Sequence, residues 1–250
     1  MLPTLGFIDM YSVFLIIGMV SALVLVEIYY RTNHFDKKVM TALELLTVVA
    51  IILGLGFANI FQNIYDLIQD PRHFHWSWNF TFYGGLIGGA AVWFLGYFLI
   101  IRRLYGPCLN EALKIAPAAI AVGHAFGRIG CFMHGCCYGK PTNCWLGIQF
   151  TTTVEKVYPT NLFEAIFLFI LSGVLFLLAM KKLGKCCFPI YMMSYGVWRF
   201  FIEYLRGDYR GSFIPGLTPS QFWSIILFLG GVAYLIVLIV LHRRGKRIVI

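Results

Sequence analysis

Long apolar runs divide this chain and constrain its fold more than any other feature. A helix that crosses a bilayer needs about 20 mostly apolar residues. The chain contains about seven runs of roughly that length, separated by short polar segments. Charged residues make up only 12 % of it, against about 25 % in a soluble domain. The sequence therefore predicts an all-α membrane protein with about seven transmembrane helices.

The predicted spans follow the apolar runs directly. No Pro-rich linker or internal repeat separates them, so we expect residues 1–250 to form a single polytopic membrane domain. Its short outer loops are expected at about 62–79, 135–160 and 206–218. The spans are expected at about Tyr11–Tyr30, Met40–Phe61, Phe80–Ile101, Leu109–Phe132, Asn161–Met180, Pro189–Tyr204 and Ser220–Leu241.

Basic residues follow every second run and predict the orientation. Lys and Arg are enriched in cytoplasmic loops, so the N-terminus is expected outside and the C-terminus in the cytoplasm. The net charge of +9 comes from these loops and not from one basic face. We therefore expect a lipid bilayer as partner and no nucleic acid. The basic clusters include Arg31, Lys37 and Lys38; Arg102 and Arg103; Lys181, Lys182 and Lys185; and Arg243, Arg244, Lys246 and Arg247.

Five charged residues lie in the outer halves of predicted spans or just beyond their outer ends: Arg128, Glu164, Arg199, Glu203 and Arg206. A charge at the bilayer centre costs about 2.5–3.5 kcal/mol, so such residues face a partner or a cavity. Arg199 and Glu203 are four residues apart and share a helix face. One interpretation is a set of ion pairs that join helices. The other is an outward-facing anion pocket, because the planar guanidinium binds phosphate or carboxylate through two hydrogen bonds.

A glycine-rich run from Tyr83 to Gly89 opens the third predicted span. Small residues let helices pack closely in a membrane. They also let a ligand approach the backbone. Both interpretations of this run can hold together.

Four cysteines are expected at the outer surface, with the spacing C-x4-C-C-x6-C: Cys131, Cys136, Cys137 and Cys144. They could form disulfides in an oxidising compartment. They could bind a soft metal with His134 or His124, although the spacing matches no standard zinc pattern. They could also be small packing residues, or one could be a working thiolate. No metal or other cofactor is expected.

The segment Gly127-Arg128-Ile129-Gly130, followed by Phe132, Gly135 and Tyr138-Gly139, resembles the signature of the prolipoprotein diacylglyceryl transferase family. The resemblance runs from about Phe80 to the C-terminus. Further segments resemble family motifs in order and spacing: Phe82–Gly88, Pro159–Glu164, Tyr195–Glu203 and Leu217–Gln221.

This resemblance implies a membrane transferase. Such an enzyme moves a diacylglyceryl group from phosphatidylglycerol to a cysteine thiol of a lipoprotein precursor, whose signal peptide carries a lipobox, and glycerol phosphate leaves. It implies a multi-pass protein of the bacterial cytoplasmic (inner) membrane with its site facing the outer leaflet. The family's seven-span topology, with the N-terminus outside, agrees with the orientation predicted from the basic loops.

The resemblance also implies residue roles. Arg128 and Arg199 would hold the lipid phosphate, and Tyr195 would hydrogen-bond it. Glu164 and Glu203 would orient the arginines or take part in proton transfer. The substrate-binding set would be Gly84, Gly85, Gly127, Gly130, Glu164 and Arg206.

The chain departs from the family pattern at several positions. Tyr83 stands where the family has His, and Cys131, His134 and Cys136 stand where it has Asn, Asn and Glu. Tyr83 and His134 are therefore predicted catalytic residues, with His124 a second candidate base. The departures leave two alternatives open: a related lipid-group transferase with a different acceptor, or a non-catalytic phospholipid-binding or transport protein.

Overall fold

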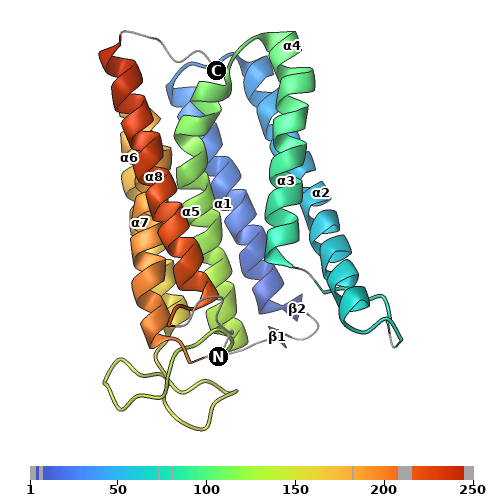
Figure 1. The fold of residues 1–250 in the computed structure, drawn as a ribbon. Coiled ribbons are helices and arrows are strands. Elements are labelled where there is room, and N and C mark those ends of the chain that lie inside the picture. Colours follow the sequence, from blue (N-terminus) through green and yellow to red (C-terminus); the bar gives the residue numbers. More distant parts are fainter. Residues whose placement is uncertain are drawn as a thin grey trace. The chain divides into compact units, whose positions relative to one another are not determined.

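The structure is a computed structural model that describes residues 4–5, 8–72, 74–79, 81–181, 183–207 and 216–244. Helices form most of it (Figure 1). A short antiparallel pair of strands, β1 (Thr4–Leu5) and β2 (Ile8–Asp9), precedes the first helix. The long helices are α1 (Met10–Thr32), α2 (Lys37–Gln69), α3 (Phe82–Gly96), α5 (Leu109–His134), α6 (Thr160–Met180), α7 (Cys187–Ile202) and α8 (Pro219–Arg243). The short ones are the π-helix η1 (Tyr97–Ile101), α4 (Arg102–Tyr105) and the 3₁₀-helices η2 (Gly184–Cys186) and η3 (Glu203–Leu205).

The predicted all-α membrane fold is confirmed. Among the described residues, six helical stretches are long and apolar enough to cross a membrane, and α3, η1 and α4 together make one of them. The sixth predicted span corresponds to α7, which has only 16 residues. The helix tightens into η3 at Glu203, so its last turn is 3₁₀ rather than α. The direction of the termini across the membrane stays a prediction.

The chain divides into two compact units. The five-helix unit contains α1, α5, α6, α7 and α8, and the hairpin unit contains α2, α3, η1 and α4. The single domain expected from the sequence stays a prediction, and each unit is described separately below.

In the hairpin unit, the glycine-rich run packs α3 against α2 (Figure 1). A Cβ atom at Gly85 would lie 3.2 Å from the Cβ of Ala58, and one at Gly89 would lie 3.3 Å from the carbonyl oxygen of Ala50. Such spacing leaves almost no room for a side chain. The close packing predicted for this run is therefore present.

Two buried asparagines in α2 organise the connection to α3. The side chain of Asn63 donates to the carbonyl oxygen of Ser77 and accepts from its N–H, at 2.9 and 2.8 Å. Asn59 donates to the carbonyl oxygens of Ser77 and Asn79. Because the returning chain satisfies these amides, α2 continues to Gln69, and the connection is shorter than the predicted range 62–79.

In the five-helix unit, small residues also set the closest helix contacts. A Cβ atom at Gly18 of α1 would lie 2.9 Å from the carbonyl oxygen of Gly123 in α5. One at Gly196 of α7 would lie 2.9 Å from the carbonyl oxygen of Ser224 in α8. The α7–α8 pair therefore packs backbone to backbone (Figure 1).

One end of the five-helix unit gathers the start of α1, the end of α5, the start of α6, the end of α7 and the start of α8. Asp9 before α1 lies 3.7 Å from His134 of α5, and Asn161 of α6 binds the carbonyl oxygen of Cys136 at 2.9 Å. Glu203 accepts a hydrogen bond from Thr218, the N-cap of α8. We call this the site end. It carries the intramembrane charges that the sequence singled out.

We predict that Gly196→Ala destabilises the protein. The new methyl group overpacks the α7–α8 contact, which costs about 1–3 kcal/mol. The measurement is thermal unfolding of the purified protein in detergent. Gly173→Ala in α6 is the matched control, because a Cβ atom there meets nothing within 4 Å. Equal melting temperatures for the two variants would contradict the prediction.

Candidate active site

A buried ionic network joins α5, α6 and α7. The Nε of Arg128 lies 3.0 Å from Oε2 of Glu164 and donates to Nε2 of His124 at 3.2 Å. The hydroxyl of Tyr195 donates to the other oxygen of Glu164 at 2.8 Å. The Glu164 side chain is 1 % exposed. A carboxylate buried this completely depends on these partners, since an unpaired one is strongly destabilising.

Helix geometry explains how this network forms. His124 and Arg128 are four residues apart in α5, so they lie on one face. Glu164 lies in the second turn of α6, at the level where α5 approaches its end. Arg128 contacts both Glu164 and His124 through Nε. Its two terminal nitrogens make no hydrogen bond to another residue in the part of the chain that the structure describes, so they are available to a ligand.

A second network links α7 to the start of α8. Nη2 of Arg199 lies 2.9 Å from Oε2 of Glu203 and donates to Oγ of Ser220 at 3.0 Å. Oγ1 of Thr218 donates to the other oxygen of Glu203 at 3.1 Å. Thr218 also forms a capping box with Gln221, which fixes the first turn of α8.

Arg199 has an unused donor. Its Nη1 is buried and has no hydrogen-bond partner among the described residues. A buried N–H group of a cation left without an acceptor costs free energy. In native proteins such a group usually indicates a ligand or an ordered water.

A third arginine lies at the site end. Arg206 is 4 % exposed, and the chain pairs there with Gly139 through an isolated β-bridge. The five-helix unit therefore gathers three arginines, Arg128, Arg199 and Arg206, and two glutamates, Glu164 and Glu203. The guanidinium N–H groups of Arg128 and Arg199 that the glutamates leave unused suit an anionic ligand.

The structure brings together most of the predicted charged residues but separates others. His134 does not join the Arg128 network: its side chain is 54 % exposed and faces Asp9. Gly130 packs against Tyr11, whereas a Cβ atom at Gly127 would meet nothing within 4 Å. The remaining predicted residues, Tyr83, Gly84 and Gly85, belong to the hairpin unit, and the side chain of Tyr83 lies outside the described residues.

The sequence did not predict roles for Thr218 or Ser220. It also did not predict that Tyr195 binds Glu164. The Thr-Pro-Ser-Gln order at 218–221 is a capping-box signal that could have placed Thr218 at a helix start. The hydrogen bond from Thr218 to Glu203 depends on how α7 and α8 pack, so no local sequence pattern predicts it. In the structure the hydroxyl of Tyr195 donates to Glu164, and its predicted hydrogen bond to the phosphate stays a prediction.

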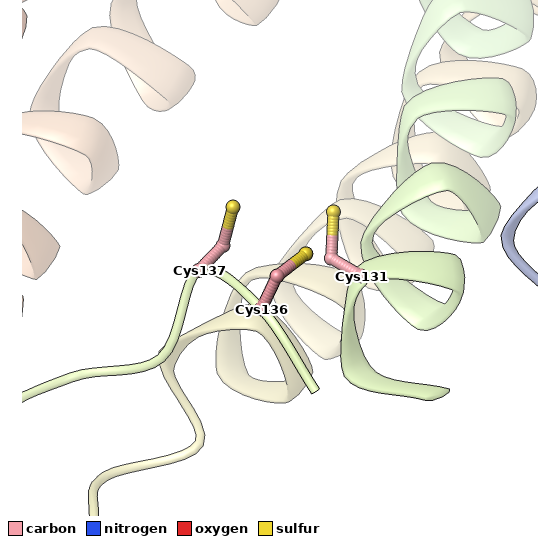
Figure 2. A group of neighbouring side chains, drawn as sticks. All are labelled: Cys131, Cys136 and Cys137. Atoms are coloured by element: carbon pink, nitrogen blue, oxygen red, sulfur yellow. The ribbon is translucent and has the colours of Figure 1, made fainter. Parts of the chain in front are cut away.

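Three cysteine thiols meet just beyond the arginine networks. The Sγ atoms of Cys131, Cys136 and Cys137 all lie within 4.8 Å of one another. Figure 2 shows the three sulfur atoms on the same side of the turn that follows α5. Hydrogen bonds with the Cys131 and Cys136 thiols, together with the charges of Arg206 and Arg128, lower the pKa of Cys137 despite its burial. All seven cysteines of the chain are free thiols in the structure.

These features define a multi-pass membrane protein with buried arginine–glutamate networks at one end of a helical unit. The profile of the family described as "Prolipoprotein diacylglyceryl transferase" matches residues 2–237. The chain belongs to this family, as its motifs predicted.

Curated relatives agree over most of their length. A phosphatidylglycerol–prolipoprotein diacylglyceryl transferase of Clostridium tetani is 30 % identical over 230 residues, covering 89 % of this chain and 90 % of the relative. A second, from Clostridium perfringens, is 36 % identical and covers 81 % and 79 %. One from Pseudoalteromonas atlantica is 27 % identical and covers 94 % and 86 %.

We predict that Tyr195→Phe destabilises the fold. The change removes the hydrogen bond to buried Glu164, which costs about 1–3 kcal/mol. Tyr191→Phe is the matched control, because it lies one turn earlier in α7, stacks on Tyr195 and makes no hydrogen bond to a described residue. Chemical unfolding in detergent measures the difference. Equal loss in both variants would show that Glu164 does not depend on Tyr195.

Proposed function

We propose that this protein transfers a diacylglyceryl group from phosphatidylglycerol to the cysteine thiol of a lipoprotein precursor. The family membership and the printed names of its relatives support this activity. The assignment to a site depends on the unused donor of Arg199, a buried Nη1 that has no partner in the described part of the chain.

The phosphate of the lipid would bind between the two arginine networks. Arg199 offers Nη1, and Arg128 offers its terminal nitrogens, because their other nitrogens are held by Glu203 and Glu164. A guanidinium fixed in this way needs no reorganisation when charge develops. The open space beside Gly127 would admit the head group next to Arg128.

The proposed reaction places new charge on that phosphate. A thiolate attacks the terminal glyceryl carbon of the diacylglycerol moiety, the carbon–oxygen bond breaks, and glycerol phosphate leaves with the bonding electrons. A phosphodiester with one negative charge becomes a monoester with two. Arginines that stabilise the second charge more than the first lower the barrier.

The other polar residues would position the arginines. Tyr195 acts through Glu164, and Ser220 and Thr218 act through Arg199 and Glu203. His124, which accepts from Arg128, is closer to the proposed phosphate site than exposed His134. We therefore favour His124 over His134 as the histidine that influences the reaction.

We further propose that the protein resides in a bacterial cytoplasmic membrane with the site end facing outward. The basic clusters that follow the odd-numbered spans support this orientation. The site would then reach lipid and precursor in the outer leaflet.

We predict that Arg128→Ala and Arg199→Ala lower transfer about 100- to 1000-fold, the usual loss for one electrostatic contact to a transition state. Purified protein is incubated with phosphatidylglycerol and a lipobox cysteine peptide, and the thioether-linked product is quantified by mass spectrometry. Arg103→Ala, an exposed arginine of the hairpin unit, is the control and keeps full activity.

Other outcomes would favour the alternatives. A wild-type protein that binds phosphatidylglycerol but makes no product would be a binding or transport protein. Transfer to a thiol other than the lipobox peptide would indicate a different acceptor, which the departures at Tyr83, Cys131 and Cys136 would explain.

We predict that maleimide labelling of native cysteines will show the site end on the outer side of the membrane. A variant whose one cysteine is Cys144, in the loop at the site end, reacts in spheroplasts with a membrane-impermeant maleimide. A variant with Cys186 alone, at the opposite end of α6, reacts only after permeabilisation. The reverse pattern would place the site on the cytoplasmic side.

A further inference from the structure

The end of α5 brings Cys131 and Cys136 together by its own backbone geometry. Gly135 has φ of +75°. Its N–H donates to the carbonyl oxygen of Phe132, and the N–H of Cys136 donates to that of Cys131. This pair of hydrogen bonds is a Schellman motif, which reverses the chain over the last helical turn. The fifth residue after Cys131 is therefore returned to it.

The next residue completes the cluster. Cys137 has φ of +59°, a left-handed conformation that non-glycine residues rarely adopt. This conformation turns the Cys137 thiol to the same side as the other two (Figure 2). The surrounding structure must hold such a residue in place.

Buried polar side chains of α6 provide that support. Asn161 donates to the carbonyl oxygen of Cys136 at 2.9 Å, and Thr160 donates to that of Cys137 at 3.1 Å. Both side chains are almost fully buried. The Thr152 hydroxyl holds the carbonyl oxygen of Gly135 at 2.7 Å. Each backbone carbonyl of the turn is thus fixed, and the three thiols are preorganised.

The spacing of the sulfur atoms suits a soft metal ion. Zinc binds thiolates at about 2.3 Å, so ligands at tetrahedral angles lie about 3.8 Å apart. The three Sγ atoms lie within 4.8 Å of one another, which is at most about 1 Å more than this spacing. Three thiolates on one Zn²⁺ carry one net negative charge, and Arg128 and Arg206 are cations that act on the Cys137 thiol.

We propose that Cys131, Cys136 and Cys137 bind a zinc ion whose fourth position takes the thiol of the acceptor cysteine. The first part stands on the thiol cluster alone, and the second rests on the function proposed above. A zinc site with three protein ligands keeps one position open for substrate. Among the alternatives that the sequence leaves open for these cysteines, this proposal favours a soft metal, held by a third thiol in place of a histidine.

Zinc would supply the activation that the acceptor thiol needs. A free cysteine thiol has a pKa of about 8.5, and a tyrosine such as Tyr83, with a pKa of about 10, is a weak base near neutral pH. A thiol that binds zinc releases its proton to solvent and becomes a thiolate. That sulfur attacks the glyceryl carbon, the carbon–oxygen bond breaks, and the phosphate monoester leaves with the electron pair. Zinc is neither oxidised nor reduced.

The first test measures zinc in the full-length protein, purified in detergent under reducing conditions. We expect about one zinc ion per chain by elemental analysis. Cys136→Ser should lose it, and Cys144→Ser, a cysteine of the same loop outside the cluster, should keep it. Absence of zinc after reconstitution with the metal, or a disulfide among the three thiols in the untreated protein, would overturn the proposal.

The second test examines whether the acceptor cysteine occupies the fourth coordination position of the metal. Co²⁺ replaces zinc and gives a thiolate-to-metal charge-transfer band. A lipobox cysteine peptide should intensify and shift this band, and the same peptide with serine should not. An unchanged spectrum with bound cobalt would exclude coordination of the acceptor.

Measurements of lipid transfer distinguish a failure of the zinc proposal from a failure of the proposed transferase function. If the zinc-free protein and Cys136→Ser transfer lipid as fast as wild type, the metal has no catalytic role and the transferase stands. If zinc binds and Co²⁺ detects the peptide but no protein forms product, the thiol site stands and the transferase fails. A loss of about 100-fold in Cys136→Ser, with Cys144→Ser fully active, supports both.

Discussion

The high free-energy cost of an unpaired charge in hydrocarbon explains how the charged residues of the site end are arranged. Arg128 is paired with Glu164 across two helices, and Arg199 with Glu203 within one. The Arg128–Glu164 pair joins α5 to α6, and the hydrogen bond from Tyr195 to Glu164 adds α7, so the interpretation of ion pairs that join helices holds for the first pair. Ion pairing alone does not account for Nη1 of Arg199, which is buried without an acceptor among the described residues. The same contacts stabilise the fold and, in the function proposed above, orient the arginines for an anionic ligand.

Local features of the sequence predicted most of the architecture. Hydropathy located the long helices because a helix that crosses a bilayer needs about 20 mostly apolar residues. The pairing of Arg199 with Glu203 followed from their i, i+4 spacing. The extension of α2 to Gln69 could not be predicted from the sequence, because it depends on how Asn59 and Asn63 bind the segment that returns toward α3. The partners of Tyr195 and Thr218 depended on helix packing in the same way.

The proposed zinc site lies outside the spacing rules for known metal sites. Such patterns describe the turns used by known zinc modules. In this chain a Schellman cap at Gly135 brings Cys131 and Cys136 together, and a left-handed residue adds Cys137. Neither device belongs to a zinc pattern. Glycine is the usual residue just beyond the end of a helix, but the effect of Gly135 on the thiols depends on the hydrogen bonds of the cap.

The location of the departures from the family pattern divides the proposed chemistry into two parts. The residues that would bind phosphate and position the arginines lie in α5, α6, α7 and the start of α8, and they match the family motifs. Cys131, His134 and Cys136 depart from the pattern and lie at the end of α5 and in the turn after it. The donor half of the reaction can therefore stay unchanged while the acceptor half is rebuilt. Since stabilising a leaving phosphate and ionising an attacking thiol are independent demands, a thiolate metal site could replace a lost base without disturbing the arginines.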